Sequence, residues 1–257
     1  MPNPDSAENE IKLMDTARKR LKYAHFPFIG RVLAAEMGRT ERVLRVLDVG
    51  CGPGNLPLLS DTGLEFGWFG LDLWRHQLTQ AADKDLYRGL CQVNLVHGLP
   101  LRTGAFDALI CNEVLMYLPN HQQLLAEFNR VLRTGGLALV YNPISWAPEI
   151  TAVLRRSLRT FHQERNSVSF DRQTDWKPAE RACRITYYSL DSLVTAVENA
   201  GFAVEQTVGF RLFRNRVRLM NRLENIEQYR AVIGSIAGRY PRMASDVLVV
   251  ARKSKDG

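Results

Sequence analysis

A short apolar run followed at once by three alternating glycines constrains this chain more than any other feature. Residues 43–49 are mostly apolar and lead directly into Gly50, Gly52 and Gly54. An apolar run that ends in glycines is typical of a buried strand entering a tight turn. Glycine lets the backbone turn sharply and lets a ligand approach the main chain closely. The segment Leu47–Gly54 is therefore the first candidate for a ligand-binding turn.

An acidic side chain stands where a ribose-binding group is expected. Asp72 ends the second apolar run, 22 residues after Gly50. A carboxylate about 20 residues beyond a glycine-rich turn accepts hydrogen bonds from ribose hydroxyls. The turn has Gly-x-Gly-x-Gly spacing rather than the Gly-x-Gly-x-x-Gly of dinucleotide sites, and it contains no basic residue to meet a pyrophosphate. Asp48, just before the turn, favours a cationic group on the ligand, such as an amino group.

Strand-like and helical patterns alternate over most of the chain, and this alternation favours a parallel sheet built from strand–helix–strand units. The apolar runs predict strands over residues 43–49, 66–73, 90–96, 106–111, 137–141, 202–210 and 244–251. Apolar spacings of three and four predict helices over residues 8–37, 76–82, 120–132 and 189–200. Ser189 is a plausible N-cap for the last of these helices, and Gly201 follows its end.

These motifs, in this order, resemble the class I S-adenosylmethionine-dependent methyltransferases, of the kind with a type 11 or type 25 methyltransferase domain. Leu47–Gly54 is similar to the family's first motif, and Asp72 is similar to its ribose-binding acid. Residues 93–101, 105–115 and 130–137 are similar to the later motifs. The resemblance implies an α/β fold with a Rossmann-like, seven-stranded, mostly parallel sheet flanked by helices.

The resemblance also implies the cofactor and the residues of the site. The cofactor would be S-adenosyl-L-methionine, which leaves as S-adenosyl-L-homocysteine, and no metal is expected. The predicted cofactor-binding residues are Asp48, Gly50, Cys51, Gly52, Gly54, Asp72, Leu73, Asn94, Leu95 and Asn112. The predicted catalytic residues, which would matter only if the acceptor must lose a proton, are Glu113, Tyr117 and Tyr188.

The predicted domain organisation is one main domain with helical additions. Residues 1–42 would form an N-terminal helical lid, and residues 43–257 the cofactor-binding domain. The helical additions lie at about 146–186 and, before the last strand, at 211–236. The chain of 257 residues is long enough to bury one substantial core.

Charge is distributed unevenly along the chain. The net charge is +7, yet residues 46–150 contain six basic and ten acidic residues, so the basic excess lies in the flanks. A basic stripe recurs at spacings of three and four at Arg211, Arg214, Arg218 and Arg222. It is either a solvated helix face or a surface that meets an anionic substrate, nucleic acid or an anionic membrane.

Three functions remain open from the sequence. The favoured one is methyl transfer to a small-molecule acceptor, with an anionic or lipid-like acceptor left open. The second is an RNA methyltransferase that uses the basic flanks, although no RNA-binding module accompanies the core. The third is an enzyme of the same fold that cyclises the cofactor or transfers its aminocarboxypropyl arm. Neither a transmembrane segment nor a signal peptide is predicted, and the scattered cysteines favour a reducing, cytoplasmic location. The oligomeric state is left open.

Overall fold

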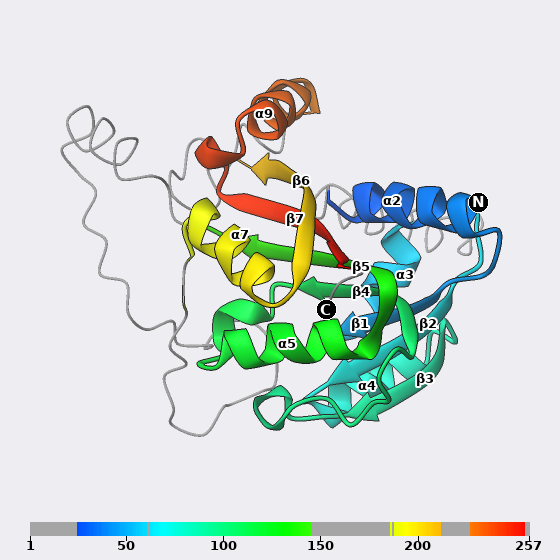
Figure 1. Ribbon diagram of the computed structural model, residues 1–257. Coiled ribbons are helices and arrows are strands. Elements are labelled where there is room, and N and C mark those ends of the chain that lie inside the picture. The colour runs from blue at the N-terminus through cyan, green and yellow to red at the C-terminus, as the bar shows by residue number, and fades with distance from the viewer. Residues whose placement is uncertain (1–24, 61, 145–185, 187, 212–226, 255–257) are drawn as a thin grey trace, which may run out of the picture. The chain divides into compact units, whose positions relative to one another are not determined.

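The computed structural model describes residues 25–60, 62–144, 186, 188–211 and 227–254. The chain divides into two compact units, residues 1–92 and 93–257, and each is described by itself (Figure 1). The boundary predicted at residue 42, which separates a lid from the main domain, stays a prediction. Residues 8–24 of the expected N-terminal helix and residues 146–185 of the first helical addition lie outside the described residues.

Three parallel strands form the sheet of the first unit. They are β1 (Arg45–Val49), β2 (Gly67–Asp72) and β3 (Tyr87–Gln92), and β2 lies between the other two. The register places Asp48 of β1 opposite Gly70 of β2. Because parallel strands end at the same edge of a sheet, the glycine turn after β1 and Asp72 at the end of β2 meet at the carboxyl edge.

The described residues of this unit also form three helices, α2 (His25–Thr40), α3 (Asn55–Ser60) and α4 (Arg75–Ala82). The described part of the first predicted helix begins at His25, so Pro27 lies in its first turn, where proline is tolerated. Helix α3 is absent from the sequence prediction. It begins directly after the glycine turn and is too short to show a clear apolar period.

In the second unit, the residues that the structure describes form four strands, in the order β4, β5, β7, β6. They span Phe106–Asn112 (β4), Leu132–Pro143 (β5), Phe202–Arg211 (β6) and Asp246–Lys253 (β7). β5 is parallel to β4, whereas β7 is antiparallel to both β5 and β6. The carboxyl ends of β4 and β5 therefore lie at one edge, next to the beginning of β7.

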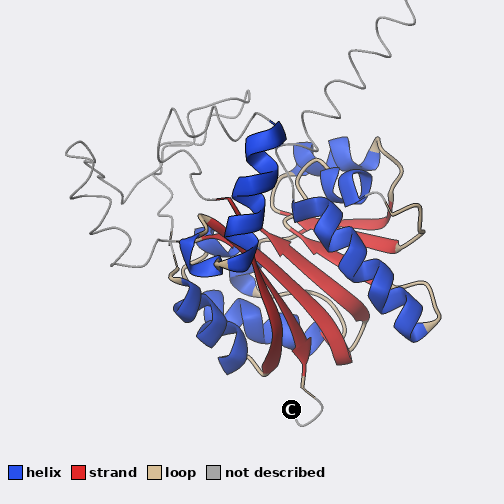
Figure 2. Cartoon of the chain, turned by 90° about the horizontal axis from the view of Figure 1, so that it is seen from above, coloured by secondary structure: helices blue, strands red, loops and turns tan. Residues whose placement is uncertain are grey.

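The described residues of the second unit form the helices η1 (Leu95–His97), η2 (Leu115–Tyr117), α5 (His121–Val131), α7 (Leu190–Asn199), α9 (Glu227–Arg239) and η3 (Pro241–Met243). Of these, η2, α5, α7, α9 and η3 contact β5, β6 or β7. Helices α5 and α7 contact each other, and Figure 2 shows helices beside the strands of this unit. The predicted cap is confirmed, since the Ser189 hydroxyl accepts from the Ser192 amide at 3.1 Å. No helix among the described residues combines the length and apolar character needed to cross a membrane.

Some predicted strand boundaries are wrong. The third strand ends at Gln92 rather than near 96, because residues 95–97 turn into a 3-10 helix. The strand predicted from Leu137 begins at Leu132, and its pairing with β4 is irregular before Ala108. Gly135 has a φ of 71° and lies within this irregular stretch of β5.

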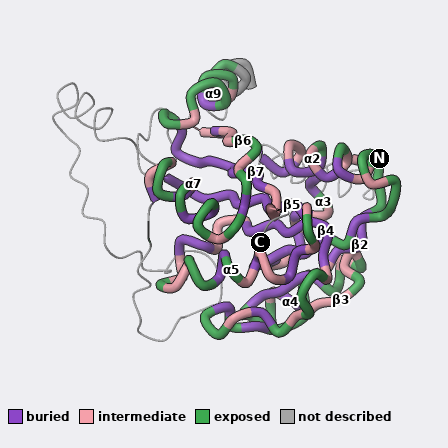
Figure 3. The backbone as a smooth tube through the Cα atoms, in the orientation of Figure 1, coloured by how far each residue is buried: buried purple, intermediate pink, exposed green. Residues whose placement is uncertain are grey.

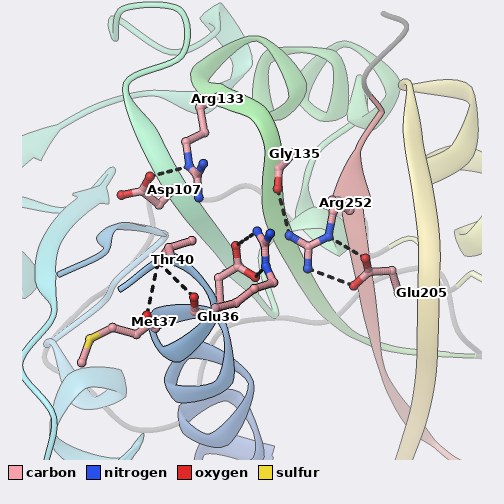
Figure 4. Close-up of polar contacts among 9 residues, drawn as sticks. Glu36, Met37, Thr40, Asp107, Arg133, Gly135, Glu205 and Arg252 are labelled. Atoms are coloured by element: carbon pink, nitrogen blue, oxygen red, sulfur yellow. Dashed lines mark hydrogen bonds and ion pairs between the residues drawn. The ribbon is translucent and has the colours of Figure 1, made fainter. Parts of the chain in front are cut away.

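The core of the second unit is formed by β4, β5 and β7, whose central residues are buried (Figure 3). Hydrogen bonds from one arginine connect β5, β6 and β7. Arg252 on β7 donates to the Glu205 carboxylate of β6 at 2.5 Å and to the Gly135 carbonyl of β5 at 2.9 Å (Figure 4). One guanidinium therefore ties three strands together, with the planar donor geometry that suits a carboxylate.

Two glycines of α2 provide a matched test of the packing between α2 and α3. A Cβ at Gly30 would lie within van der Waals overlap of the Ser60 carbonyl oxygen, whereas a Cβ at Gly38 would meet nothing within 4 Å. We expect Gly30→Ala to lower the free energy of unfolding by about 1–3 kcal/mol through overpacking. Gly38→Ala should raise it by about 0.5–1 kcal/mol, because alanine loses less backbone entropy in a helix. Urea denaturation of both variants tests this, and equal effects would contradict the close approach.

Candidate cofactor site

The turn after β1 is a backbone loop that requires its glycines. Gly50, Gly52 and Gly54 have φ values of 72°, 53° and 73°, in the left-handed region that other residues rarely adopt. The amides of Gly50 and Cys51 donate to the Leu71 carbonyl of β2 at 2.7 and 2.9 Å. The loop is therefore hydrogen-bonded to the neighbouring strand through its own main chain.

Asp72 is joined directly to this loop. One oxygen of its carboxylate accepts from the Gly52 amide at 2.9 Å, and the other accepts from the Trp74 amide at 2.9 Å. Each carboxylate oxygen offers about two lone-pair directions, so each can still accept from one ribose hydroxyl. Asp72 is buried, while Leu73 beside it is 41% exposed. These residues fit the adenosine part of S-adenosylmethionine, with a diol acceptor next to an available apolar surface.

Asp48 is the second acidic residue of the first unit's site, and it is almost fully buried. Its carboxylate accepts a hydrogen bond of 2.7 Å from the Tyr87 hydroxyl. The pKa of Asp48 is raised to about 7, because burial and the nearby Asp72 raise it by more than the hydrogen bond from Tyr87 lowers it. A carboxyl that titrates near neutral pH beside a glycine turn is suited to hold an ammonium group, which favours the ionised form.

Two residues near the loop were missed in the sequence. Tyr87 is one, because the third strand was predicted to begin only at residue 90. Lys84 is the other, since its ammonium donates to the Pro53 carbonyl within the glycine loop from 31 positions away. The loop thus has a basic neighbour, although it contains no basic residue itself. Burial and the two nearby acids raise the pKa of the Cys51 thiol, which therefore stays protonated.

In the second unit, the structure places Asn94 and Leu95 in the turn of η1 rather than on a strand. The Asn94 amide oxygen accepts from the Val96 amide at 3.2 Å and caps η1, while Leu95 is buried. The segment that follows is held by α5: Glu127 accepts from the Leu99 amide at 2.9 Å. Arg130 donates to the carbonyl oxygens of Leu99 and Leu101 at 2.9 and 2.7 Å. An ion pair on α5 therefore holds the segment that directly follows Asn94 and Leu95.

Asn112 and Glu113 lie at the carboxyl end of β4. Asn112 is the last residue of the strand, and Glu113 directly after it has a φ of 58°. The Glu113 amide donates to the Tyr141 carbonyl of β5 at 2.9 Å, which holds the backbone in this costly conformation. Left-handed backbone at a residue other than glycine concentrates at functional sites. The roles predicted for Asn112 and Glu113 stay predictions, at a strand end where the backbone is strained.

The structure also brings the two predicted catalytic tyrosines into one region of the second unit. Tyr117 ends η2, and the segment with Tyr188 runs beside η2, because the Thr186 amide donates to the Met116 carbonyl at 2.8 Å. Tyr188 is buried, with its ring 5.1 Å from that of His121 in an edge-to-face arrangement. Burial raises the pKa of Tyr188 to about 12, so its phenol is a proton donor rather than a base at neutral pH.

Part of the basic stripe is outside the described residues. Arg211 ends β6, and its carbonyl accepts from the Ser245 amide. Arg214, Arg218 and Arg222 lie in residues 212–226, which the structure does not describe. The described portion of this predicted insert is helix α9, which extends to Arg239.

Comparison with known proteins finds a methyltransferase domain in this part of the chain. A family model described as a methyltransferase domain matches residues 47–140, which include the glycine turn, Asp72 and the whole of β4. A demethylmenaquinone methyltransferase of Geobacillus kaustophilus is 33% identical over 101 residues, 37% of this chain and 43% of that protein. A probable 18S rRNA (guanine-N(7))-methyltransferase of Dictyostelium discoideum is 29% identical over 133 residues, 47% of this chain and 45% of that protein. The chain thus spans less than half the length of these relatives.

Solved structures show the same fold over most of the chain. An S-adenosylmethionine-dependent methyltransferase of Mesorhizobium loti has a TM-score of 0.52 at 17% identity, covering 82% of this chain and 91% of that one. The [4+2]-cyclase SpnF has a TM-score of 0.55 at 19% identity, covering 88% of this chain and 80% of that one. Residues 47–140 therefore match a methyltransferase domain, and the chain, with its seven strands and flanking helices, has the fold of an S-adenosylmethionine-dependent methyltransferase.

Proposed function

We propose that the protein transfers the methyl group of S-adenosylmethionine to a small-molecule acceptor by in-line displacement. The observation that supports it best is the hydrogen bond from the Gly52 amide to the Asp72 carboxylate. It joins the loop suited to the methionine part of the cofactor to the acid suited to its ribose. When bound, S-adenosylmethionine supplies an electrophilic sulfonium methyl group.

In this proposal each residue of the first unit has one task. The Asp72 carboxylate accepts from the ribose hydroxyls, and the exposed Leu73 packs against the adenine. Gly50, Gly52 and Gly54 let the backbone approach the cofactor, and the Asp48 carboxylate accepts from the amino group of its methionine part. From the second unit we propose Asn94, Leu95 and Asn112 as further cofactor contacts.

Proton transfer depends on the acceptor. Glu113 is the proposed base if the acceptor must lose a proton as it attacks, because a backbone held in a costly conformation presents its carboxylate at the end of β4. Tyr117 and Tyr188 then orient the acceptor, and the phenol of Tyr188 keeps its proton at neutral pH. An acceptor that arrives deprotonated needs no base, and alignment alone can provide most of the rate.

The relatives keep a second acceptor class open. One is named for demethylmenaquinone and another for 18S rRNA, while one protein of this fold is a cyclase. The acidic character of residues 46–150 supports a small molecule over a polyanion, since phosphate contacts need Lys and Arg. We also propose a reducing, cytoplasmic location, which the wide spacing of Cys51, Cys91, Cys111 and Cys183 along the sequence supports.

The reaction itself is tested with methyl-labelled S-adenosylmethionine. We expect label to pass into the low-molecular-mass fraction of a deproteinised cell extract and not into purified bulk tRNA. With the cofactor alone, no S-adenosylhomocysteine should accumulate above the rate without enzyme. Cofactor turnover in the absence of any acceptor would instead indicate cyclisation or arm transfer, and label in tRNA would indicate the RNA reaction.

Asp72 tests the cofactor assignment directly. Asp72→Ala should weaken S-adenosylhomocysteine binding by about 1–3 kcal/mol, because two charge-assisted hydrogen bonds to the ribose are lost. Isothermal titration calorimetry measures this, with Asp83→Ala as the matched control at an exposed acid next to α4. A folded Asp72→Ala protein with unchanged affinity would refute the ribose role.

Asp48 predicts a pH dependence of stability. Its pKa in the folded protein is raised to about 7 from 3.8, so between those values the folded state binds a proton that the unfolded state does not. Wild-type stability should therefore fall, relative to Asp48→Asn, as the pH rises from about 4 to about 7, and the difference should level off above that. At pH 8 we expect Asp48→Asn to be more stable by on the order of a few kcal/mol. Denaturant unfolding from pH 4 to 8 measures it, and a constant difference would contradict the assignment.

A further inference from the structure

We propose that Tyr87 is a positioning residue of the cofactor site: its hydroxyl holds the Asp48 carboxyl in place and keeps it competent to accept from the cofactor's amino group. The inference rests on the proposed function and adds to it a residue outside the glycine motif. It starts from the hydrogen bond of 2.7 Å between the Tyr87 hydroxyl and Asp48, which connects β3 to β1.

This hydrogen bond joins side chains of β1 and β3 across β2, and a glycine on β2 leaves space for it. Because β2 lies between β1 and β3, a side chain at the crossing point would block the phenol. That point is Gly70, which is opposite Asp48 in the register. A Cβ there would lie 3.0 Å from Cε1 of Tyr87 and 2.8 Å from the Cys51 sulfur. The absence of a side chain at Gly70 is therefore what lets Tyr87 reach Asp48.

The same ring also supports the glycine loop. A Cβ at Gly54 would lie 2.9 Å from Cε2 of Tyr87, so the ring packs directly against the loop backbone. Tyr87 thus contacts two parts that the cofactor needs, the Asp48 carboxylate and the last glycine of the turn. One aromatic side chain can fix both relative to each other, because its two rotatable angles are limited by this packing.

The electrostatics give the contact a specific consequence. The ionisable groups near Asp48 are Tyr87 from β3, Asp72 from β2 and Cys51 from the loop, with Lys84 close to Cys51. Burial and Asp72 raise the pKa of Asp48, whereas the hydrogen bond from Tyr87 lowers it. The pKa of Tyr87 itself is raised, so it stays a donor. Without the hydroxyl, Asp48 would be neutral over a wider pH range and a weaker partner for an ammonium group.

Tyr87→Phe tests this, because it removes only the hydroxyl and keeps the ring that supports Gly54. Two ligands distinguish an effect on the Asp48 carboxyl from an effect on the cofactor site as a whole. S-adenosylhomocysteine has the amino group, whereas 5′-methylthioadenosine has the same adenosine and thioether without it. By calorimetry at neutral pH, we expect about a tenfold loss of affinity for the first ligand and less than about a twofold change for the second. Tyr240→Phe, at an exposed tyrosine of the second unit, is the matched control.

Two further measurements distinguish the role from a structural one. The midpoint at which affinity for S-adenosylhomocysteine rises with pH should move upward by about one unit in Tyr87→Phe. In an Asp48→Asn background, the same substitution should have no further effect, since the group it acts on no longer titrates.

The outcomes are distinct. Equal losses for both ligands, an unmoved pH midpoint, or additive effects in the double variant would overturn the positioning role and leave the proposed function standing. A wild-type protein that binds neither ligand would overturn both the proposed function and this inference.

Discussion

The hydrogen bonds between the glycine turn and the end of β2 are the constraint on which the candidate site depends. The amides of Gly50 and Cys51 bind the Leu71 carbonyl, and the next residue along β2 accepts from Gly52. Three successive amides are satisfied by two adjacent residues of the neighbouring strand. Donors that would otherwise point into solvent or a ligand are thereby fixed, so the loop is shaped before a cofactor arrives. Such preorganisation reduces the entropic cost of binding.

The sequence predicted those parts of the site that depend on the backbone. Alternating glycines need left-handed φ values, and an acid at the end of the next parallel strand must meet them at the same edge. Both consequences follow from local geometry, and both are observed. The late helix with its Ser189 cap was predictable for the same reason, since its start and stop signals lie within a few residues.

Features that depend on contacts between distant side chains were not predictable. Tyr87 contacts Asp48, which lies 39 positions away, across β2 at Gly70. No local sequence pattern indicates this contact. The capping role of Asn94 was also missed, because a strand pattern over 90–96 competes with a turn and only the observed backbone decides between them. Likewise, the support of Leu99 and Leu101 by Glu127 and Arg130 joins segments about 30 residues apart.

The glycine at position 70 has a consequence for how chains of this kind can diverge. Because Gly70 has no side chain, the Tyr87 ring on β3 can contact the Asp48 carboxyl on β1. Any larger residue at position 70 blocks this contact, so a tyrosine at 87 can no longer donate a hydrogen bond to an aspartate at 48. Positions 48, 70 and 87 should therefore change together or not at all. A family member with a branched residue at 70 would need another way to keep its buried acid charged.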